Sequence, residues 1–438
     1  MCDPAGRRNR LGTGEAAKVA CVTTAPPRRR ILLDTRPLRH APYRRLWTST
    51  IVTAVGSQFT AVAVPKQIYD MTGSSAWVGI ASAVGLAPLI VFALWGGAIA
   101  DTVDRRKLML ATNTGIALLL IVFWLQSALD LGSIPLLLVL VAVQQALFGM
   151  NMPARTASVS RLVPIGELPA AVALNSTVMQ AGWIVGPLLA GALIPVAGLP
   201  LLYLLDALAL CVALWAVWRL PPIPPLNGEQ RRAGFRDVFA GFSYLATHPL
   251  LLVSFGADIV AMVLGMPRAL FPELAARGYA GVGNDFALGL LFAAIPIGAL
   301  AGGLLSGTFS HVRRHGLMVL LAVGAWGLAI VGFGLSRSIW LAVGFLALAG
   351  VADMVSMVFR GTILQEAATD EMRGRMQGVH TVVVTGGPRL ADLGHGVTAS
   401  AAGATAATVG GGLLVIVATV ALALAVPAFL RYRGAARG

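Results

Sequence analysis

Residues 97–107 read Gly97-Ala98-Ile99-Ala100-Asp101-Thr102-Val103-Asp104-Arg105-Arg106-Lys107, and they separate two long apolar stretches. The segment places two carboxylates and three cations where one apolar run ends and the next begins. Because charged side chains are costly in hydrocarbon, we expect this loop to lie at a membrane surface between two helices.

The composition of the 438-residue chain is that of a membrane protein. Hydrophobic residues make up 57% of it, charged residues only 12%, and the mean hydropathy is +0.79. In lipid every backbone amide needs an internal partner, so a span is either a helix or part of a closed barrel. The apolar runs are too long and too little alternating for barrel strands. The sequence therefore predicts an all-α, polytopic membrane protein.

Twelve apolar runs are candidates for transmembrane helices, most of them about 20 residues long or longer. The six in the first half are Trp47–Pro65, Trp77–Ala100, Leu108–Leu129, Ile134–Pro153, Leu168–Ala197 and Pro200–Trp218. The six in the second half are Leu250–Phe271, Phe286–Ser310, Leu317–Leu335, Trp340–Leu364, Met376–Ala399 and Ala404–Leu430.

A polar hinge divides these runs six and six. It begins Pro221-Pro222-Ile223-Pro224-Pro225 and continues with Arg231, Arg232, Arg236 and Asp237, so it combines helix-breaking prolines with charges that lipid disfavours. We therefore expect five parts: a basic, disordered cytoplasmic tail at residues 1–42, a six-helix half at 43–220, a cytoplasmic linker at 221–248, a second six-helix half at 249–430 and a short cytoplasmic tail at 431–438.

The positions of lysine and arginine predict the orientation in the membrane. About 27 of the 33 lie in the N-terminal tail, the even-numbered loops or the C-terminal tail. Positive charge accumulates on the cytoplasmic side, so both termini should be cytoplasmic. This rule accounts for the net charge of +14, so the charge gives no reason to expect a nucleic-acid partner. Arginine outnumbers lysine heavily and Ala and Gly are abundant, which suggests a bacterial protein and hence the bacterial plasma membrane.

The two halves carry glycines and prolines at matched positions. The fifth run contains Gly182, Gly186-Pro187 and Gly191, and the eleventh contains Gly387-Pro388. Each Gly-Pro pair follows an acidic loop. Such matching favours two parallel six-helix repeats with a substrate path between them near the midplane. Close helix packing is the alternative explanation for any single glycine. Each Gly-Pro pair is a candidate site for helix bending or for close packing against a neighbouring helix.

The chain resembles the major facilitator superfamily along nearly its whole length after residue 42. Its loop at residues 97–107 is similar to the signature loop of that superfamily between helices two and three, and residues 182–191 resemble the glycine-proline motif of its drug-exporting antiporters. Asp104 stands where that signature usually has glycine. The resemblance implies 12 transmembrane helices in two six-helix pseudo-repeats around a central cavity. The gating motif would comprise Gly97, Asp101, Asp104, Arg105, Arg106 and Lys107.

Within that superfamily the chain is most similar to the enterobactin-exporter and macrolide-efflux group. The similar stretches are residues 62–65, 67–68, 293–299 and 373–375, while Lys66 replaces an expected apolar residue. The resemblance implies export of a small organic molecule, siderophore-like, from the cytoplasm by proton antiport. Multidrug or macrolide efflux is the alternative within the superfamily, and a channel is the disfavoured alternative outside it.

Charged and polar residues inside the spans are candidates for mechanism, because such charges usually face a cavity or a partner. Asp258 and Asp353 lie about 13 Å and about 18 Å from the cytoplasmic ends of their spans, at 1.5 Å per residue. They are candidates for proton coupling, with a structural bond to Arg360 or to a backbone group as the alternative. Asp101 is expected to hold the cytoplasmic side shut with Arg105 and Arg106.

Four polar residues are candidates for lining the substrate cavity: Gln58, Arg360, Arg389 and Asp392. Arg389 and Asp392, three residues apart, are expected to form an internal ion pair. Lys66 and Asp70 are expected to form a surface pair.

Other functional classes lack their signatures. No GxxxxGK[ST] loop is present for an ATP-driven pump, and the six histidines stand in no nucleophile-and-base pattern. Cys2, Cys21 and Cys211 have no metal or disulfide spacing. We therefore expect a monomeric transporter rather than an enzyme, without cofactor or metal, whose partners are a small-molecule substrate, protons and the lipid bilayer.

Overall fold

The computed structural model describes residues 34–225, 235–277, 279, 282–309 and 311–434. Most of the expected N-terminal tail, the middle of the expected linker and residues 435–438 therefore lie outside the described residues. Helices make up nearly all of the described chain, which contains no strand and only an isolated bridge between Tyr279 and Val282. The prediction of an all-α fold is confirmed.

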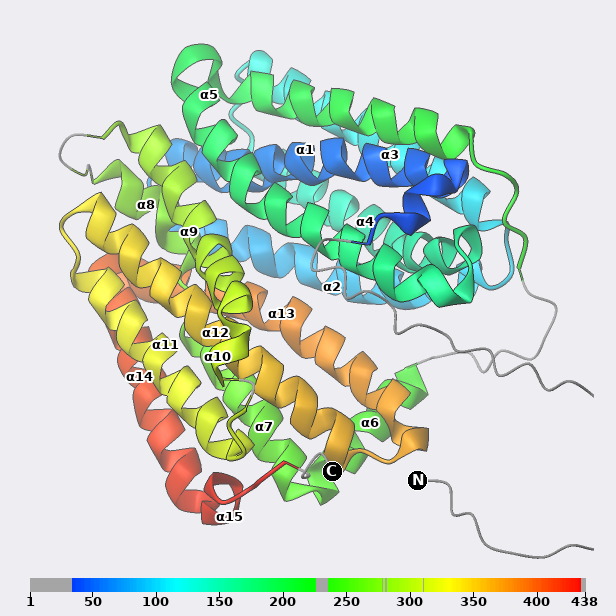
Figure 1. The fold of residues 1–438 in the computed structure, drawn as a ribbon. Helices are drawn as coiled ribbons and strands as arrows, with labels where there is room; N and C mark the ends of the chain where they lie inside the picture. Colours follow the sequence, from blue (N-terminus) through cyan, green and yellow to red (C-terminus); the bar gives the residue numbers. More distant parts are fainter. Residues whose placement is uncertain (1–33, 226–234, 278, 280–281, 310, 435–438) are drawn as a thin grey trace, which may run out of the picture. The chain divides into compact units, whose positions relative to one another are not determined.

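The first half begins with the 3-10 turn η1 (Arg36–Arg39) and holds five long helices (Figure 1). They are α1 (Ala41–Thr72), α2 (Ser75–Ala100), α3 (Arg105–Ala128), α4 (Ile134–Leu162) and α5 (Leu168–Trp218), with the turn η2 (Ile165–Glu167) before α5. Helix α5 contains both the fifth and the sixth expected spans, and the two helical arms meet at a non-helical kink at Gly198, where φ is 70°. Glycine adopts this left-handed conformation without the strain that a Cβ would add.

The second half begins with a short helix, α6 (Phe235–Thr247), inside the expected linker. Its other elements are α7 (Pro249–Ile259), η3 (Val260–Leu264), η4 (Arg268–Leu270), α8 (Phe271–Ala276), α9 (Asn284–Leu304), α10 (Ser306–Phe309), α11 (His315–Leu335), α12 (Ile339–Ala367), α13 (Asp370–Ala402), α14 (Ala404–Ala425) and α15 (Pro427–Leu430). Figure 1 shows α9 and α11 to α14 as the long helices of this half.

The expected seventh span, Leu250–Phe271, lies within Pro249–Ala276, a stretch that is long and apolar enough to cross a membrane, but its helix is interrupted. The chain passes from α7 into a π-helical turn at Val260–Leu264, breaks, and resumes as a 3-10 turn and the short helix α8. The break contains Gly265 and Pro267. Proline supplies no backbone N–H, and π-turns mark places where the regular ladder is interrupted.

Nine helical stretches of the described chain are long and apolar enough to cross a membrane. One of them, Ile165–Trp218, contains two of the expected spans around the turn at Gly198. The first and eleventh expected spans correspond to α1 and α13, which fall outside that set.

Within each half the long helices pack in a bundle, and two pairs join the halves. Helix α1 packs on α5 and α2 on α4, while α9 packs on α12 and α11 on both α12 and α14. Between the halves, α2 packs on α13 and α5 packs on α9. These two pairs frame the region in which the site lies.

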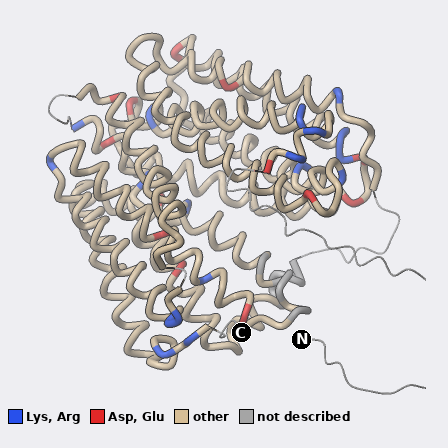
Figure 2. Tube along the Cα trace, in the orientation of Figure 1, with Lys and Arg blue, Asp and Glu red and all other residues tan. Residues whose placement is uncertain are grey.

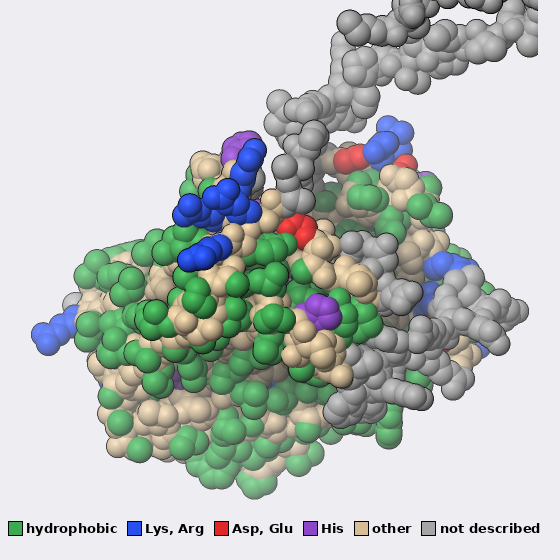
Figure 3. Space-filling view, turned by 90° about the horizontal axis from the view of Figure 1, so that it is seen from below, with side chains coloured by type: hydrophobic (Ala, Val, Ile, Leu, Met, Phe, Trp, Pro, Cys, Tyr) green, Lys and Arg blue, Asp and Glu red, His purple; other side chains and the backbone are tan. Residues whose placement is uncertain are grey.

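Large hydrophobic side chains cover much of the outer surface. Leu118, Val139, Leu328 and Leu424 are between 58% and 75% exposed, as expected of a surface that faces lipid. Figure 2 shows Lys and Arg gathered mainly toward helix ends, and Figure 3 shows a face dominated by hydrophobic side chains. The described chain is therefore a multi-pass membrane protein.

Candidate functional site

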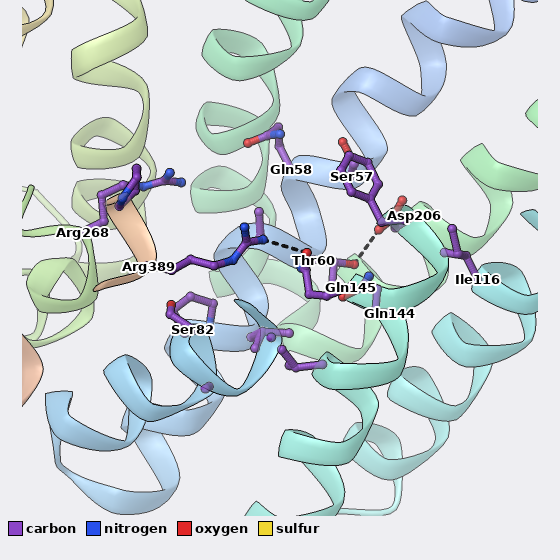
Figure 4. Close-up of a pocket in the computed structure, with 18 of the residues that line it drawn as sticks. Ser57, Gln58, Thr60, Ser82, Ile116, Gln144, Gln145, Asp206, Arg268 and Arg389 are labelled. Atoms are coloured by element: carbon purple, nitrogen blue, oxygen red, sulfur yellow. Dashed lines mark hydrogen bonds between the residues drawn. The ribbon is translucent and has the colours of Figure 1, made fainter. Parts of the chain in front are cut away.

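A cavity of about 560 Å³ lies among α1 to α5, η4, α9 and α13. We call it the central cavity. Its polar lining includes Gln58 on α1, Asp206 on α5 and Arg389 on α13 (Figure 4). Asp392 on α13 also lines it. Both halves of the chain contribute to it, so relative motion of the halves would change its access.

Three of the four residues expected to line a substrate cavity do line this one: Gln58, Arg389 and Asp392. Arg360 does not. It lies in a separate pocket of about 120 Å³, together with Ser254 and His380.

Arg389 and Asp392 do not form the expected ion pair, since no contact within 4 Å joins their charged atoms in the described chain. Instead, Arg389 Nη2 donates to Gln145 Oε1 at 2.7 Å, a bond drawn in Figure 4. Asp392 accepts from the Ser82 hydroxyl at 2.7 Å and from the backbone N–H of Ala269 at 3.0 Å. Residues three apart point about 60° apart around a helix, which lets neighbouring helices supply separate partners.

Asp206, which lies within the sixth expected span, forms a hydrogen bond with a residue of α1. Thr60 Oγ1 donates to Asp206 Oδ2 at 2.6 Å (Figure 4). Asp206 is 6% exposed and Thr60 is 4% exposed, yet both line the central cavity. An aspartate within an apolar run is visible in the sequence, but its partner, 146 residues away, is not.

The two carboxylates expected to couple protons flank Arg360. Arg360 Nη1 forms an ion pair with Asp258 Oδ1, and Arg360 Nη2 lies 3.8 Å from Asp353 Oδ1. The side chains of Asp258, Arg360 and Asp353 are 2%, 8% and 27% exposed. The structure thus places both candidates for proton coupling beside Arg360, the residue expected to bind them if their role is structural. None of the three lines the central cavity.

The gating motif forms the turn between α2 and α3. Asp101 follows the last residue of α2, and its Oδ1 lies 3.8 Å from Arg105 Nη2. Asp104 caps α3 by accepting from the backbone N–H of Arg106 at 2.9 Å, and it also accepts from the backbone N–H of Ile223 at 3.1 Å. With φ at −57°, Asp104 needs no glycine-like conformation, which explains how this chain dispenses with the glycine of the superfamily.

The remaining motif residues differ in their surroundings. Arg106 donates through Nη2 to the backbone carbonyl of Trp218 at the end of α5. Lys107 is exposed, and a Cβ at Gly97 would meet no atom within 4 Å. The loop is therefore tied to the exit of α5 through both the Asp104 and the Arg106 side chains.

The glycines of the fifth and eleventh runs are packing positions. A Cβ on Gly182 would lie 2.7 Å from the carbonyl oxygen of Ala54, and one on Gly186 would lie 2.5 Å from Gln58 Cβ, so both let α5 approach α1. A Cβ on Gly191 would lie 2.7 Å from the carbonyl oxygen of Asp285, at the contact with α9.

The Gly-Pro pairs lie inside helices. Pro187 lies within α5, and Pro388 lies within α13 and lines the central cavity. A Cβ on Gly387 would lie 2.9 Å from Met262 Cβ. The absence of a side chain at residue 387 therefore lets the π-helical turn η3 pack closely against α13. Proline at these positions removes one helix hydrogen bond each.

Two further polar contacts join the halves. Their acidic residues, Asp285 and Glu273, were not identified from the sequence. Lys66 Nζ contacts Asp70 Oδ2 at 2.8 Å, as expected, and also Asp285 Oδ1 on α9 at 3.2 Å. The hydroxyl of Ser75, at the start of α2, donates to Glu273 Oε2 on α8 at 2.6 Å. We call these two contacts the latch. It lies at the ends of α1 and α2 that are joined by the short turn at Gly73, away from the gating motif.

Comparisons with known proteins agree with this geometry. Residues 34–433 match the family described as transmembrane secretion effectors. The chain is 30% identical over 383 residues to the enterobactin exporter EntS of Citrobacter koseri, and 31% identical over 383 residues to that of Shigella boydii. Each alignment covers 86% of this chain and 90% of the relative.

Solved transporter structures share the fold. A bacterial homologue of the human lysosomal transporter Spinster, inward-facing and unoccupied, has a TM-score of 0.69 at 18% identity, covering 92% of this chain and all of that one. A variant of the nucleoside transporter NupG has a TM-score of 0.72 at 12% identity, covering 89% of this chain and 99% of that one. The chain therefore belongs to the transmembrane secretion effectors, a family of exporters in the major facilitator superfamily.

Proposed function

We propose that this protein is a secondary active exporter that moves a small, siderophore-like organic molecule out of the bacterial cytoplasm in exchange for protons. The observation that carries the proposal is the central cavity, which is lined by polar and charged residues from both halves of a transporter fold. The similarity to enterobactin exporters supports both the direction and the cargo class.

Alternating access is the proposed cycle. The described contacts between the halves include the latch and the close packing of Gly191 on α9. With the positive-inside orientation, which places both termini and the gating motif in the cytoplasm, the latch lies on the outer side. Export would require the latch to open and the gating motif to close against the second half.

Proton coupling is assigned to the cluster of Asp258, Asp353 and Arg360. Arg360 lies between two carboxylates and is nearly buried, so the cluster cannot gain or lose a charge without a change in its ion pairs. Protonation of one carboxylate would release Arg360 toward the other. That exchange would couple a proton to a movement of α7 relative to α12.

Multidrug or macrolide efflux is the second candidate function. The observation that favours it is the mixed lining of the central cavity, where large apolar side chains such as Trp183 and Phe148 accompany the polar ones. Apolar and aromatic walls with few polar groups suit varied ligands.

The proposal is tested with purified protein reconstituted in liposomes loaded with enterobactin. An imposed pH gradient should drive enterobactin movement, while collapse of the gradient by a protonophore should stop it. Asp130→Asn is the matched control, because Asp130 is exposed in the turn between α3 and α4 and its left-handed φ of 48° suits asparagine.

Gradient-driven movement of a macrolide such as erythromycin, without movement of enterobactin, would establish the second candidate instead. Movement of either compound at the same rate with and without the gradient would contradict proton antiport.

A further inference from the structure

We propose that the small pocket beside Arg360 is a water-filled route by which protons leave the charge cluster for the cytoplasm, and that His380 is its proton relay. This inference rests on the proposed proton antiport and deepens it, because it names the path and a residue that carries the proton. We call the pocket, whose polar lining is Ser254, Arg360, Gln365 and His380, the release pocket.

Three helices place the release pocket on the same side of the cluster. On α7, Ser254 lies one turn nearer to the helix start than Asp258, and on α12, Gln365 lies beyond Arg360 toward the helix end. His380 lies about three turns from the start of α13. The positive-inside orientation places the start of α7, the end of α12 and the start of α13 at the cytoplasmic surface. The pocket therefore lies between the cluster and the cytoplasm.

The release pocket joins a buried charge to an exposed side chain. Arg360 is 7% exposed, whereas Gln365 is exposed. The two residues are separated by about 7.5 Å along α12, at 1.5 Å per residue. A proton that leaves the cluster through this pocket therefore has a short way to the surface of the second half.

The volume and lining of the release pocket suit water. The pocket measures about 120 Å³, and one water needs on the order of 10–15 Å³ of such space, so there is room for several. Arg360 Nε is buried and donates to no group of the described chain, while Ser254, Gln365 and His380 add polar atoms to the wall. Water in the pocket would accept from Nε and connect these groups by hydrogen bonds.

His380 is the side chain of this pocket that can pass a proton on. Its ring packs nearly perpendicular to that of Phe255, with 6.1 Å between centroids, so it has a defined place in the wall. Imidazole accepts a proton at one nitrogen and releases one from the other near neutral pH. In the proposed step the O–H bond of protonated Asp353 or Asp258 breaks, and the proton passes through water to a His380 nitrogen. The carboxylate pairs again with Arg360, and the other ring nitrogen releases a proton to cytoplasmic water.

The other titratable groups on the elements around His380 have different surroundings. Arg360 is close enough to interact with His380 electrostatically, and it is paired with the carboxylate of α7. On α6, Tyr244 stacks on a neighbouring histidine, and on α12, Glu366 accepts from a tyrosine after α15. Arg268 on η4 lines the central cavity, while η3, α2 and α14 contain no titratable side chain. In the described part of these helices, His380 therefore links the cluster to the exposed end of the pocket.

The first test measures access to the pocket by thiol labelling, in a variant whose three native cysteines are replaced by serine. Ser254→Cys places a thiol in the wall of the pocket. Ser356→Cys is the matched control, because both serines are 3% exposed but Ser356 does not line the pocket. In inside-out membrane vesicles, the membrane-impermeant reagent (2-sulfonatoethyl) methanethiosulfonate should label Ser254→Cys and leave Ser356→Cys unlabelled. In right-side-out vesicles it should label neither.

The second test measures the relay in inside-out vesicles, where export appears as uptake of enterobactin driven by an acidic interior. A positioned proton-transfer group contributes about 10²-fold or more, so His380→Ala should slow this uptake at least about tenfold. Imidazole added at the cytoplasmic face should restore part of the rate, after correction for its effect on the native protein. His311→Ala is the matched control, because His311 is exposed between α10 and α11, and it should export at the native rate. His380→Gln should be as slow as His380→Ala and replaces it if that variant fails to fold.

Three results would overturn the inference while native export stays intact. They are equal labelling of Ser254→Cys and Ser356→Cys from the cytoplasmic face, export at the native rate by folded His380→Ala or His380→Gln, and a slow His380→Ala that imidazole does not restore. The last result would assign His380 a packing role. Absence of gradient-driven uptake by the native protein would instead overturn the proposed antiport, and the release route with it, so the two failures are distinguishable.

Discussion

The charge cluster around Arg360 allows the structural and coupling roles of two aspartates to be separated. Asp258 is almost fully enclosed and paired with Arg360, whereas Asp353 is 27% exposed and lies 3.8 Å from the same guanidinium. Arg360→Met should leave Asp258 as a buried, unpaired charge, which costs about 3–5 kcal/mol. Asp353→Asn removes a longer and more solvated contact, so it should cost less than about 1 kcal/mol.

The stability of each variant can be followed by thermal unfolding in detergent, using the fluorescence of the nine tryptophans. In the double variant Asp258→Asn with Arg360→Met only the partly exposed Asp353 loses its contact, and no enclosed carboxylate is left unpaired. This variant should therefore recover most of the stability that Arg360→Met loses. Asp130→Asn serves again as the control for loss of a carboxylate.

Transport then assigns the coupling role. Asp353→Asn should retain its fold and its substrate exchange without a gradient but lose gradient-driven export, because asparagine resembles a permanently protonated acid. Equal destabilisation by Asp353→Asn and Arg360→Met, or absence of rescue in the double variant, would refute this division of roles. Gradient-driven export by both Asp258→Asn and Asp353→Asn would place the proton site elsewhere.

Three further predictions concern the moving parts. Asp101→Asn should lower export while membrane insertion stays normal, since its carboxylate is expected to hold the gate; full export at normal expression would contradict this. Gly186→Leu should stall export more than it lowers the unfolding temperature, because even a Cβ there would lie 2.5 Å from Gln58 Cβ; equal loss in both assays would indicate packing alone. Lys66→Met removes the contact with Asp285 and should raise the labelling of a cysteine introduced near the latch by about two- to fivefold, corresponding to about 0.4–1 kcal/mol; unchanged labelling would show that this contact does not restrain the outer side.

Properties that depend on neighbours in the chain were predictable from the sequence. Apolar runs longer than a bilayer requires must be helical, because lipid offers backbone groups no other partner. The loop at residues 97–107 was recognisable for the same reason, since its charges interrupt two such runs. Even the break in the seventh span left a local signal in Gly265 and Pro267, although the run around them is apolar enough to be taken for one helix.

Which polar groups meet depends on how the helices pack in three dimensions. Asp206 and Thr60 are 146 residues apart, and Arg389 and Gln145 are 244 apart, so no local pattern links them. Each pairing depends on the rotation of two helices about their axes and on close approaches such as that of α5 to α1 at Gly182. Helix periodicity placed Arg389 and Asp392 near one another, but neighbouring helices offered each a separate partner. Local sequence therefore predicts a membrane protein with twelve apolar runs and identifies the charged residues inside them. Helix packing specifies which of those charges share a cavity, because it brings together residues that are distant in the chain.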